Sequence, residues 1–247
     1  MASASALLIG LSRQTALARE ADVIANNLAN INTTGFKRDG AVFETYLTPG
    51  ARDESFLPRD RQLAFVLDRG LSHDFTPGAM KLTGNELDVA IQGEGFFAVE
   101  TPQGERYTRN GAFTRNAQRE LVTSEGFRVL GDRGPIVFTA DDKSISIAAD
   151  GTVSGKDAKG RLRLVKFDNP QRLERVGAGL FAAREPAQPA TGVRVAQGTL
   201  EGSNVNGIAE TSRLLEVSRA YQDLSGLLQR ADDLRRSAIE RLGQVQA

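Results

Sequence analysis

The residues that break regular structure are gathered in the middle of this 247-residue chain. All eight prolines lie between Pro49 and Pro189, whereas the first 34 residues contain one glycine and the last 40 contain two. Because proline and glycine are the strongest interruptions of helices, only the two ends of the chain can form long helices. The sequence therefore predicts helical ends around a centre of shorter elements.

Both ends carry apolar residues at helical spacing, in helices predicted from Ser5 to Ala29 and from Ile208 to Val245. Steps of three and four residues place these side chains in one narrow seam along each helix. The seam residues are Leu17, Ala21, Ile24 and Leu28 in the first helix and Leu214, Val217, Tyr221, Leu224 and Leu228 in the second. Such seams, on a second helix of unusual length, are typical of a coiled coil.

The middle of the chain has a different pattern. Residues 87–131 contain short runs of β-forming residues, separated by turn signals such as "RNG" at 109–111 and "SEG" at 124–126. Similar runs continue to about residue 185, whereas residues 40–80 look like an extended, irregular connection. Short strands at this spacing predict a compact antiparallel sheet or barrel.

We therefore expect an α+β protein. Its long terminal helices are predicted to pair as a coiled-coil-like domain, and its centre is predicted to form an antiparallel β-rich domain. The predicted parts are an N-terminal helix (1–34), an extended connector (35–80), the β-rich domain (81–190), a return connector (191–206) and a C-terminal helix (207–247).

The composition argues against several classes of function. Lys plus Arg and Asp plus Glu each number 31, and this balance gives no support to electrostatic capture of nucleic acid or anionic membranes. Without cysteine there is no thiolate nucleophile and no Cys-ligated zinc. The one histidine, His73, is interpreted as an ordinary loop residue. Lys37 and Arg38, interleaved with acids, are interpreted as part of a solvated face.

No catalytic, cofactor-binding or metal site is predicted, and no small-molecule substrate. The glycines of "GEGFFA" at 93–98 precede a strand-like run, whereas a dinucleotide site needs a helix directly after them. No apolar run approaches the ~20 residues that a membrane span needs. The N-terminus also lacks the basic segment of a cleaved signal peptide.

Three blocks of the sequence resemble bacterial flagellar axial proteins, the family of rod and hook subunits. They are "ANNLANINTTGFKRDGAVFE" (25–44), "LDVAIQGEGFFAVETPQGERYTRNGAFTRN" (87–116) and "GTLEGSNVNGIAETSRLLEVSRAYQ" (198–222). The short middle of the chain resembles the proximal rod members most. The "RAYQ" at 219–222 is more similar to distal rod members, so a distal rod protein is the alternative.

The resemblance implies a structural subunit that polymerises helically through its terminal helices into the flagellar drive shaft. This shaft transmits torque from motor to hook and encloses the export channel. The implied partners are other copies of the chain, the proximal and distal rod proteins and the type III export apparatus. The implied location is the basal body in the periplasm, reached without a cleaved signal peptide. The family brings no catalytic residues and no cofactor.

The polar residues beyond each seam are predicted to form a junction between the inner helical tube and the outer domain. These residues are Asn26, Asn27, Asn30, Thr34, Gly35, Phe36, Asn204 and Asn206. Asn206 is also a good N-cap for the C-terminal helix. Two alternatives from other classes are a peptidoglycan hydrolase, for which no paired-acid motif is recognisable, and a soluble coiled-coil adaptor, which leaves the β domain unexplained.

Overall fold

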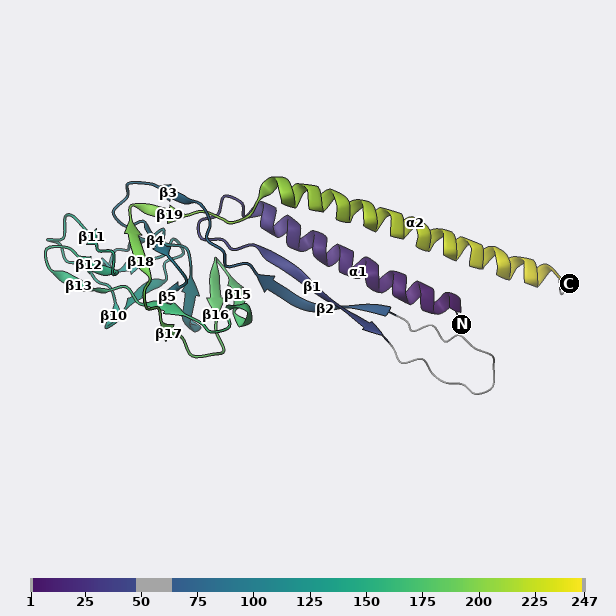
Figure 1. The fold of residues 1–247 in the computed structure, drawn as a ribbon, viewed down its shortest axis with the longest axis horizontal. Helices are drawn as coiled ribbons and strands as arrows, with labels where there is room; N and C mark the ends of the chain where they lie inside the picture. The colour runs from purple at the N-terminus through teal and green to yellow at the C-terminus, as the bar shows by residue number, and fades with distance from the viewer. Residues whose placement is uncertain (1, 48–63, 246–247) are drawn as a thin grey trace. The chain divides into compact units, whose positions relative to one another are not determined.

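The computed structural model describes residues 2–47 and 64–245. Helices α1 (Ala2–Ala29) and α2 (Gly207–Val245) lie at the two ends of the chain, with strands between them (Figure 1). The chain divides into two compact units. Unit 1 comprises the described parts of 1–28, 39–72 and 206–247, and unit 2 comprises 29–38 and 73–205. The chain thus passes from one unit to the other at 28/29, 38/39, 72/73 and 205/206.

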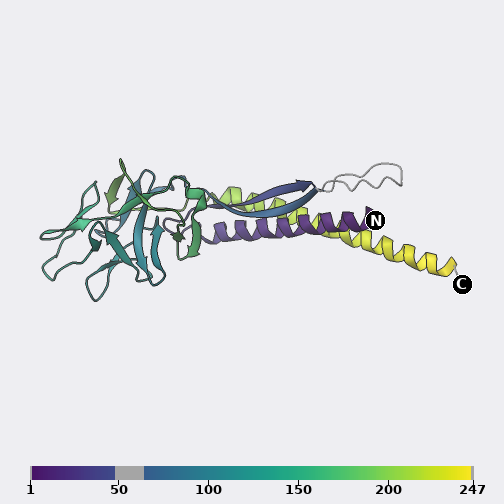
Figure 2. The same ribbon diagram turned by 90° about the horizontal axis from the view of Figure 1, so that it is seen from below.

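In unit 1, α1 and α2 run side by side in opposite directions (Figures 1 and 2). Gln14 Nε2 donates a hydrogen bond of 3.0 Å to Ser225 Oγ. Nearer the end of α1, Glu20 pairs with Arg213 at 2.8 Å. The same unit contains strand β1 (Asp39–Leu47) and, except for its last residue, strand β2 (Ala64–His73). These two strands pair with each other.

The prediction of a coiled-coil-like helical domain is wrong. The described residues contain two α-helices, and these share their unit with the β1–β2 pair instead of forming a domain alone. In a coiled coil each seam residue inserts between side chains of the partner helix, yet Tyr221 of the predicted seam is 37% exposed. The spacing of apolar residues identifies the apolar face of a helix, but it does not identify the element that packs against that face.

Unit 2 is built from short strands that pair antiparallel. The strands are β3 (Met80–Leu82), β4 (Val89–Gln92), β5 (Phe96–Thr101), β6 (Gly104–Thr108), β7 (Thr114–Arg115), β8 (Leu121–Val122), β9 (Arg128–Gly131), β10 (Gly134–Pro135), β11 (Ser146–Ile147), β12 (Thr152–Ser154), β13 (Ala158–Arg161), β14 (Leu164–Lys166), β15 (Glu174–Gly177), β16 (Leu180–Ala182), β17 (Gln188–Pro189), β18 (Arg194–Gln197) and β19 (Thr199–Glu201). A short 3-10 helix, η1 (Pro170–Arg172), precedes β15.

The largest sheet of unit 2 has ten strands, in the order β15-β16-β6-β5-β9-β8-β7 with β10, β14 and β17 attached. Smaller sheets are formed by β11-β12-β13, by β18-β4 and by β19-β3. Their antiparallel pairing agrees with the β-rich centre expected from the turn signals. The predicted domain boundaries stay predictions, and residues 48–63 of the predicted connector lie outside the described residues.

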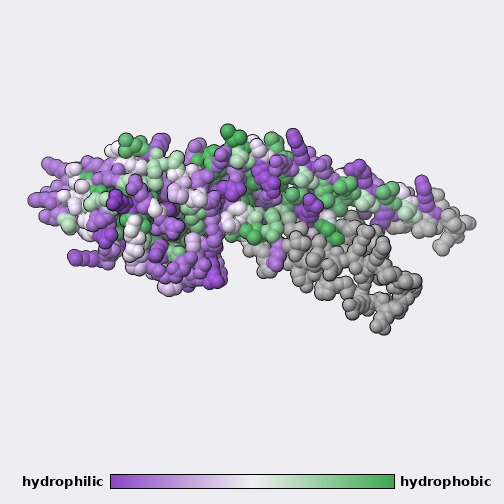
Figure 3. Space-filling view, in the orientation of Figure 1, coloured by the Kyte–Doolittle hydropathy of each residue, from purple (hydrophilic) through white to green (hydrophobic). Residues whose placement is uncertain are grey.

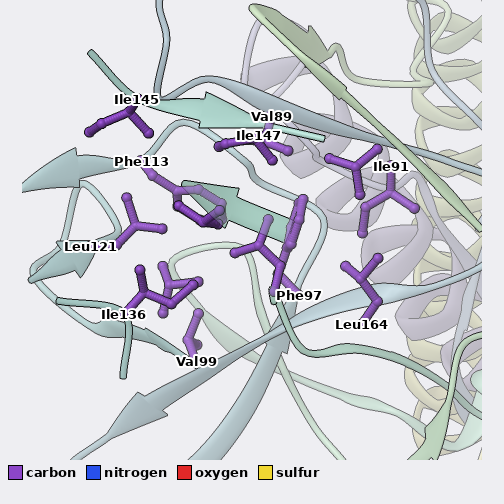
Figure 4. Close-up of a cluster of buried hydrophobic side chains, with 14 of the residues drawn as sticks. Val89, Ile91, Phe97, Val99, Phe113, Leu121, Ile136, Ile145, Ile147 and Leu164 are labelled. Atoms are coloured by element: carbon purple, nitrogen blue, oxygen red, sulfur yellow. The ribbon is translucent and has the colours of Figure 1, made fainter. Parts of the chain in front are cut away.

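Strand β5 lies between two apolar clusters because successive side chains of a strand point to opposite faces. Phe97 and Val99 belong to the larger cluster (Figure 4). Phe96 and Ala98 belong to a second, aromatic cluster. A strand buried on both faces reads as a continuous apolar run, which explains the sequence "FFAV" at 96–99.

His73 lies at the end of β2, in unit 2, and is buried. Its Nε2 atom is 3.0 Å from Leu173 O, and its ring packs against Phe75 and Phe181 at centroid distances of 5.8 and 5.5 Å. The interpretation of His73 as an ordinary loop residue is therefore wrong, because the aromatic cluster encloses it.

The buried carboxylate of Asp142 organises the turn between β10 and β11. It accepts hydrogen bonds from Thr139 N (2.6 Å), Thr139 Oγ1 (2.8 Å) and Lys156 N (2.7 Å), and it pairs with Lys159 Nζ at 2.7 Å. The bond from Lys159, followed by the backbone donors, holds the pKa of Asp142 well below its usual range. These partners therefore favour the ionised form in the folded protein.

We expect Asp142→Asn to destabilise unit 2 at pH 7, with a smaller difference from wild type at pH 3. A lowered folded pKa gives stability that is present above the unfolded pKa of about 4 and is lost as pH falls below it. Urea unfolding of both proteins at pH 7 and pH 3 measures this, with the neighbouring exposed residue in Asp141→Asn as the control. Equal destabilisation by Asp142→Asn at both pH values would contradict the electrostatic role.

Candidate assembly site: terminal helices and motif segment

The chain itself covers the predicted seam residues only in part. Ile24 and Val217 are buried. The side chains of Leu17, Ala21, Leu28, Leu214, Leu224 and Leu228 are half-buried, and Tyr221 is exposed. The two helices approach closely at Gly10, where an added Cβ would lie 2.5 Å from Leu228 Cδ2.

Further apolar side chains of the helices are exposed outright. Leu8 and Leu11 of α1 and Leu227 of α2 are each 57% exposed, and Leu234 of α2 reaches 73%. Figure 3 shows hydrophobic residues interspersed with hydrophilic ones along α2. Leu227 lies next to the seam residue Leu228, and this doubled leucine is the sequence signal of a wider apolar stripe that the seam analysis missed.

Asn27 joins the end of α1 to the beginnings of β1 and α2 within unit 1. Its Oδ1 accepts a hydrogen bond from Asp39 N (2.9 Å), and its Nδ2 donates to Asp39 O (2.7 Å) and to Glu210 Oε2 (3.2 Å). Asn27 and Glu210 are both buried. Glu210 lies in the first turn of α2, where the helix dipole favours a negative charge.

The motif segment, residues 29–38, leaves α1 through two tight turns. Thr33 N donates to Asn30 O (3.1 Å), and Phe36 N donates to Thr33 O (3.2 Å). Gly35 has a φ of +67°, and a Cβ there would lie 2.4 Å from Asn110 N. Only glycine fits both the left-handed backbone and this approach to another backbone.

Beside Gly35 lies a buried charge cluster of Lys37, Arg109 and Glu201. Lys37 Nζ donates to Glu201 Oε1 at 2.6 Å and to Thr76 O at 2.7 Å. Arg109 Nη1 lies 3.8 Å from Glu201 Oε2, and its Nη2 donates to Gly93 O at 2.8 Å. The Lys37 and Glu201 side chains are fully buried. The interpretation of Lys37 as part of a solvated face is therefore wrong.

The charge cluster contains two cations and one carboxylate. Burial, as the largest cause, lowers the pKa of Lys37, and the hydrogen bond and charge of Glu201 oppose this effect. Burial likewise lowers the pKa of Arg109, again opposed by Glu201. Buried charges persist only when they are paired, and Glu201 lies within 4 Å of both cations. Glu94 and Asp74 add weaker attraction to Arg109 and Lys37.

Two further contacts hold the motif segment within unit 2. Asn204 Oδ1 accepts a hydrogen bond from Arg38 N at 2.7 Å. The guanidinium of Arg175 lies between the rings of Phe36 and Phe181, at 4.5 and 4.9 Å from their centroids. Arg175 Nη2 also donates to Lys37 O at 2.6 Å. Phe36 is therefore fixed by a cation–π contact as well as by burial.

The remaining predicted junction residues take several positions. Asn206 caps α2, because its Oδ1 accepts hydrogen bonds from Ile208 N (3.1 Å) and Ala209 N (3.2 Å). This confirms the capping predicted for Asn206. Asn26 is exposed, whereas Asn30 and Thr34 are half-buried. Whether subunits meet at these residues stays a prediction.

Two further properties concern only the part of the chain that the structure describes. There, no three side chains of His, Cys, Asp or Glu come together as a possible metal cluster. Within the same residues, neither helix has a stretch that is both long and apolar enough to cross a bilayer.

Three family models match the chain. They are described as "Flagella basal body rod protein" (residues 7–37), "Flagellar hook protein FlgE/F/G D1 domain" (90–155) and "Flagellar basal body rod FlgEFG protein C-terminal" (196–241). The chain belongs to the family of flagellar basal-body rod proteins, which are structural proteins, because full-length relatives match it as well.

Two of these relatives are named "Flagellar basal-body rod protein FlgF". The one from Caulobacter vibrioides is 40% identical over 98% of this chain and 99% of its own length. The one from Mesorhizobium japonicum is 35% identical over 96% and 97%. A relative named "Flagellar basal-body rod protein FlgG", from Agrobacterium fabrum, is 34% identical over 93% and 96%.

Each family match contributes one member of the charge cluster. Lys37 ends the first match, Arg109 lies in the second and Glu201 lies in the third. The cluster is therefore the place in unit 2 where three sequence blocks, far apart in the chain, meet through charge.

Proposed function

We propose that this chain is a subunit of the proximal flagellar rod and polymerises helically through its terminal helices. The observation that carries the proposal is the set of exposed apolar side chains on α1 and α2, in a chain of the rod protein family. Leu8, Leu11, Leu227 and Leu234 would leave water if these helix faces packed against other subunits. Burying one leucine stabilises an interface by roughly 1.5–3 kcal/mol.

In this proposal the seam residues Leu17, Ala21, Ile24, Leu28, Leu214, Val217, Tyr221, Leu224 and Leu228 contribute to the packing of helices within and between subunits. The polymer is the drive shaft in the periplasm, and it surrounds the export channel. Its partners are copies of this chain, other rod proteins and the type III export apparatus, which exports the chain without signal-peptide cleavage. The chain has no catalytic role, so zymography on peptidoglycan with purified protein is expected to show no cleared zone.

Leu227→Asp tests the role of the exposed helix surface. Because Leu227 is 57% exposed, the charge is tolerated in the free chain but is costly inside a subunit interface. We expect unchanged circular dichroism of the purified protein, together with loss of assembled rods in isolated basal bodies and loss of motility. Normal rods in this variant would contradict assembly through this surface.

Gln229→Asp is the matched control, because it places the same charge two residues away on the same helix, at an exposed polar position. Rods and motility are expected to be normal in this variant. If both variants block assembly equally, the effect comes from charge on α2 and not from burial of Leu227.

The alternative within the family is a distal rod protein. It is favoured by the 34% identity to a FlgG protein and by the "RAYQ" around Tyr221. The distal rod contains many subunits and the proximal rod few, so the number of copies per isolated basal body separates the two positions. A high copy number would overturn the proximal assignment and leave the assembly mode unchanged.

A further inference from the structure

Residues 199–210, here called the strap, bond to segments that lie far away in the sequence. In unit 2, β19 of the strap pairs with β3. Gly35 N donates to Glu201 O at 2.7 Å, and Gly202 N donates to Ala79 O at 2.8 Å. The strap backbone therefore contacts both the motif segment and the residues before β3.

Strap side chains repeat these connections. Glu201 Oε1 accepts hydrogen bonds from Lys37 Nζ (2.6 Å) and Gly78 N (3.0 Å). Asn204 accepts one from Arg38 N through Oδ1. Through Nδ2, Asn204 donates to Asp74 O (2.8 Å) and Thr76 O (3.1 Å). Residues 35–38 and 74–79 are thus joined by one segment that comes more than 120 residues later in the chain.

Much of unit 2 does not depend on the strap. The ladder of β5 with β6 and β9 lies between residues 96 and 131 and pairs locally. Locally paired strands form sooner than strands that must close a long loop. Without Glu201, however, Lys37 and Arg109 would be two buried cations with no carboxylate of the cluster between them, which disfavours docking of the motif segment.

The strap also completes unit 1. Glu210 is its last residue, and Glu210 Oε2 accepts the hydrogen bond from Asn27 Nδ2. Asn27 holds Asp39 through two further hydrogen bonds. Within each unit, a part of the chain from the N-terminal 40 residues is therefore joined to the strap through a buried carboxylate.

We propose that the strap closes last and fixes the motif segment when it does so. The β5, β6 and β9 ladder forms first. Residues 35–38 stay undocked until Glu201 and Asn204 arrive from the C-terminal part of the chain. A chain whose strap has not yet bound then has a formed β core and an accessible N-terminal motif segment.

Pulse-labelling hydrogen exchange during refolding of the full chain tests the order. We expect the amides of β5 and β9 to gain protection first, and those of Gly35 and Gly202 to gain it later and at the same rate. Protection of Gly35 before Gly202, or simultaneously with β5, would overturn the proposal.

Asn204→Ala tests in the native state whether the strap holds the motif segment. The substitution removes the hydrogen bonds of the Asn204 side chain to residues 38, 74 and 76 and leaves the β5, β6 and β9 ladder intact. We expect the Gly35 and Gly78 amides to exchange about tenfold faster or more, given the several hydrogen bonds lost, while β5 and β9 amides keep their rates. The control is Asn85→Ala, which removes the bond from Asn85 Nδ2 to Asp88 Oδ1 in the same unit and is expected to leave Gly35 unchanged. If the amides of Gly35 and β5 exchange faster by the same factor, or if the Gly35 amide does not exchange faster, the proposed role of the strap is wrong.

Discussion

Glu201→Gln is expected to lower the free energy of unfolding by roughly 3–5 kcal/mol, because it removes the one carboxylate of the cluster that pairs with both buried cations. Glutamine keeps the shape of the side chain and can still accept hydrogen bonds from Lys37 and Gly78. The loss therefore reports the charge and not the packing. Chemical denaturation at pH 7, followed by fluorescence and circular dichroism, measures it.

Two comparisons sharpen this prediction. Lys37→Met leaves one cation and one carboxylate, a balanced pair, so it is expected to cost less than Glu201→Gln. Glu100→Gln removes a carboxylate paired with Arg128 at 2.9 Å on the surface, where both side chains are more than 40% exposed. Such pairs contribute about 0–1 kcal/mol. If Lys37→Met lowers the free energy of unfolding more than Glu201→Gln does, the stability of the charge cluster does not depend mainly on its single carboxylate.

Gly35→Ala is expected to destabilise unit 2 by roughly 2–5 kcal/mol, from two causes that add. A left-handed backbone costs a non-glycine residue about 1–2 kcal/mol. A new Cβ would also lie 2.4 Å from Asn110 N and 2.5 Å from Arg109 C, so the backbone of residue 35 or of residues 109–110 must move. Overpacking of this kind costs about 1–3 kcal/mol. Thermal and urea unfolding give the value.

Gly126→Ala is the matched control for Gly35→Ala. Gly126 also has a positive φ, of +89°, but an added Cβ there meets nothing within 4 Å. Gly126→Ala should therefore show the backbone cost alone. Equal losses in the two variants would mean that the approach of Gly35 to residues 109–110 is not tight in solution.

Much of the fold could be read from the sequence because the signals are local. The clustering of breakers between Pro49 and Pro189 located both helices, and Asn206 marked the start of α2 through its capping side chain. Turn signals such as "RNG" indicated a β-rich centre. The sequence could not predict which element packs against the helix seams, because the spacing of Leu17 or Tyr221 does not specify the partner surface.

The charge cluster could not be predicted for a related reason. Lys37 and Glu201 are 164 residues apart, and nothing local distinguishes Glu201 from the other acidic residues of the chain. The same holds for Arg175, whose position between Phe36 and Phe181 depends on the folded sheet. Resemblance to a family located the segments that matter, but the contacts between them form only in the folded chain.

The four passages of the chain between the two units have a mechanical consequence. A single peptide linker can swivel about its own bonds, so it transmits little torsion from one part of a molecule to another. Here the backbone passes between the units four times, at 28/29, 38/39, 72/73 and 205/206, so no single covalent connection joins them.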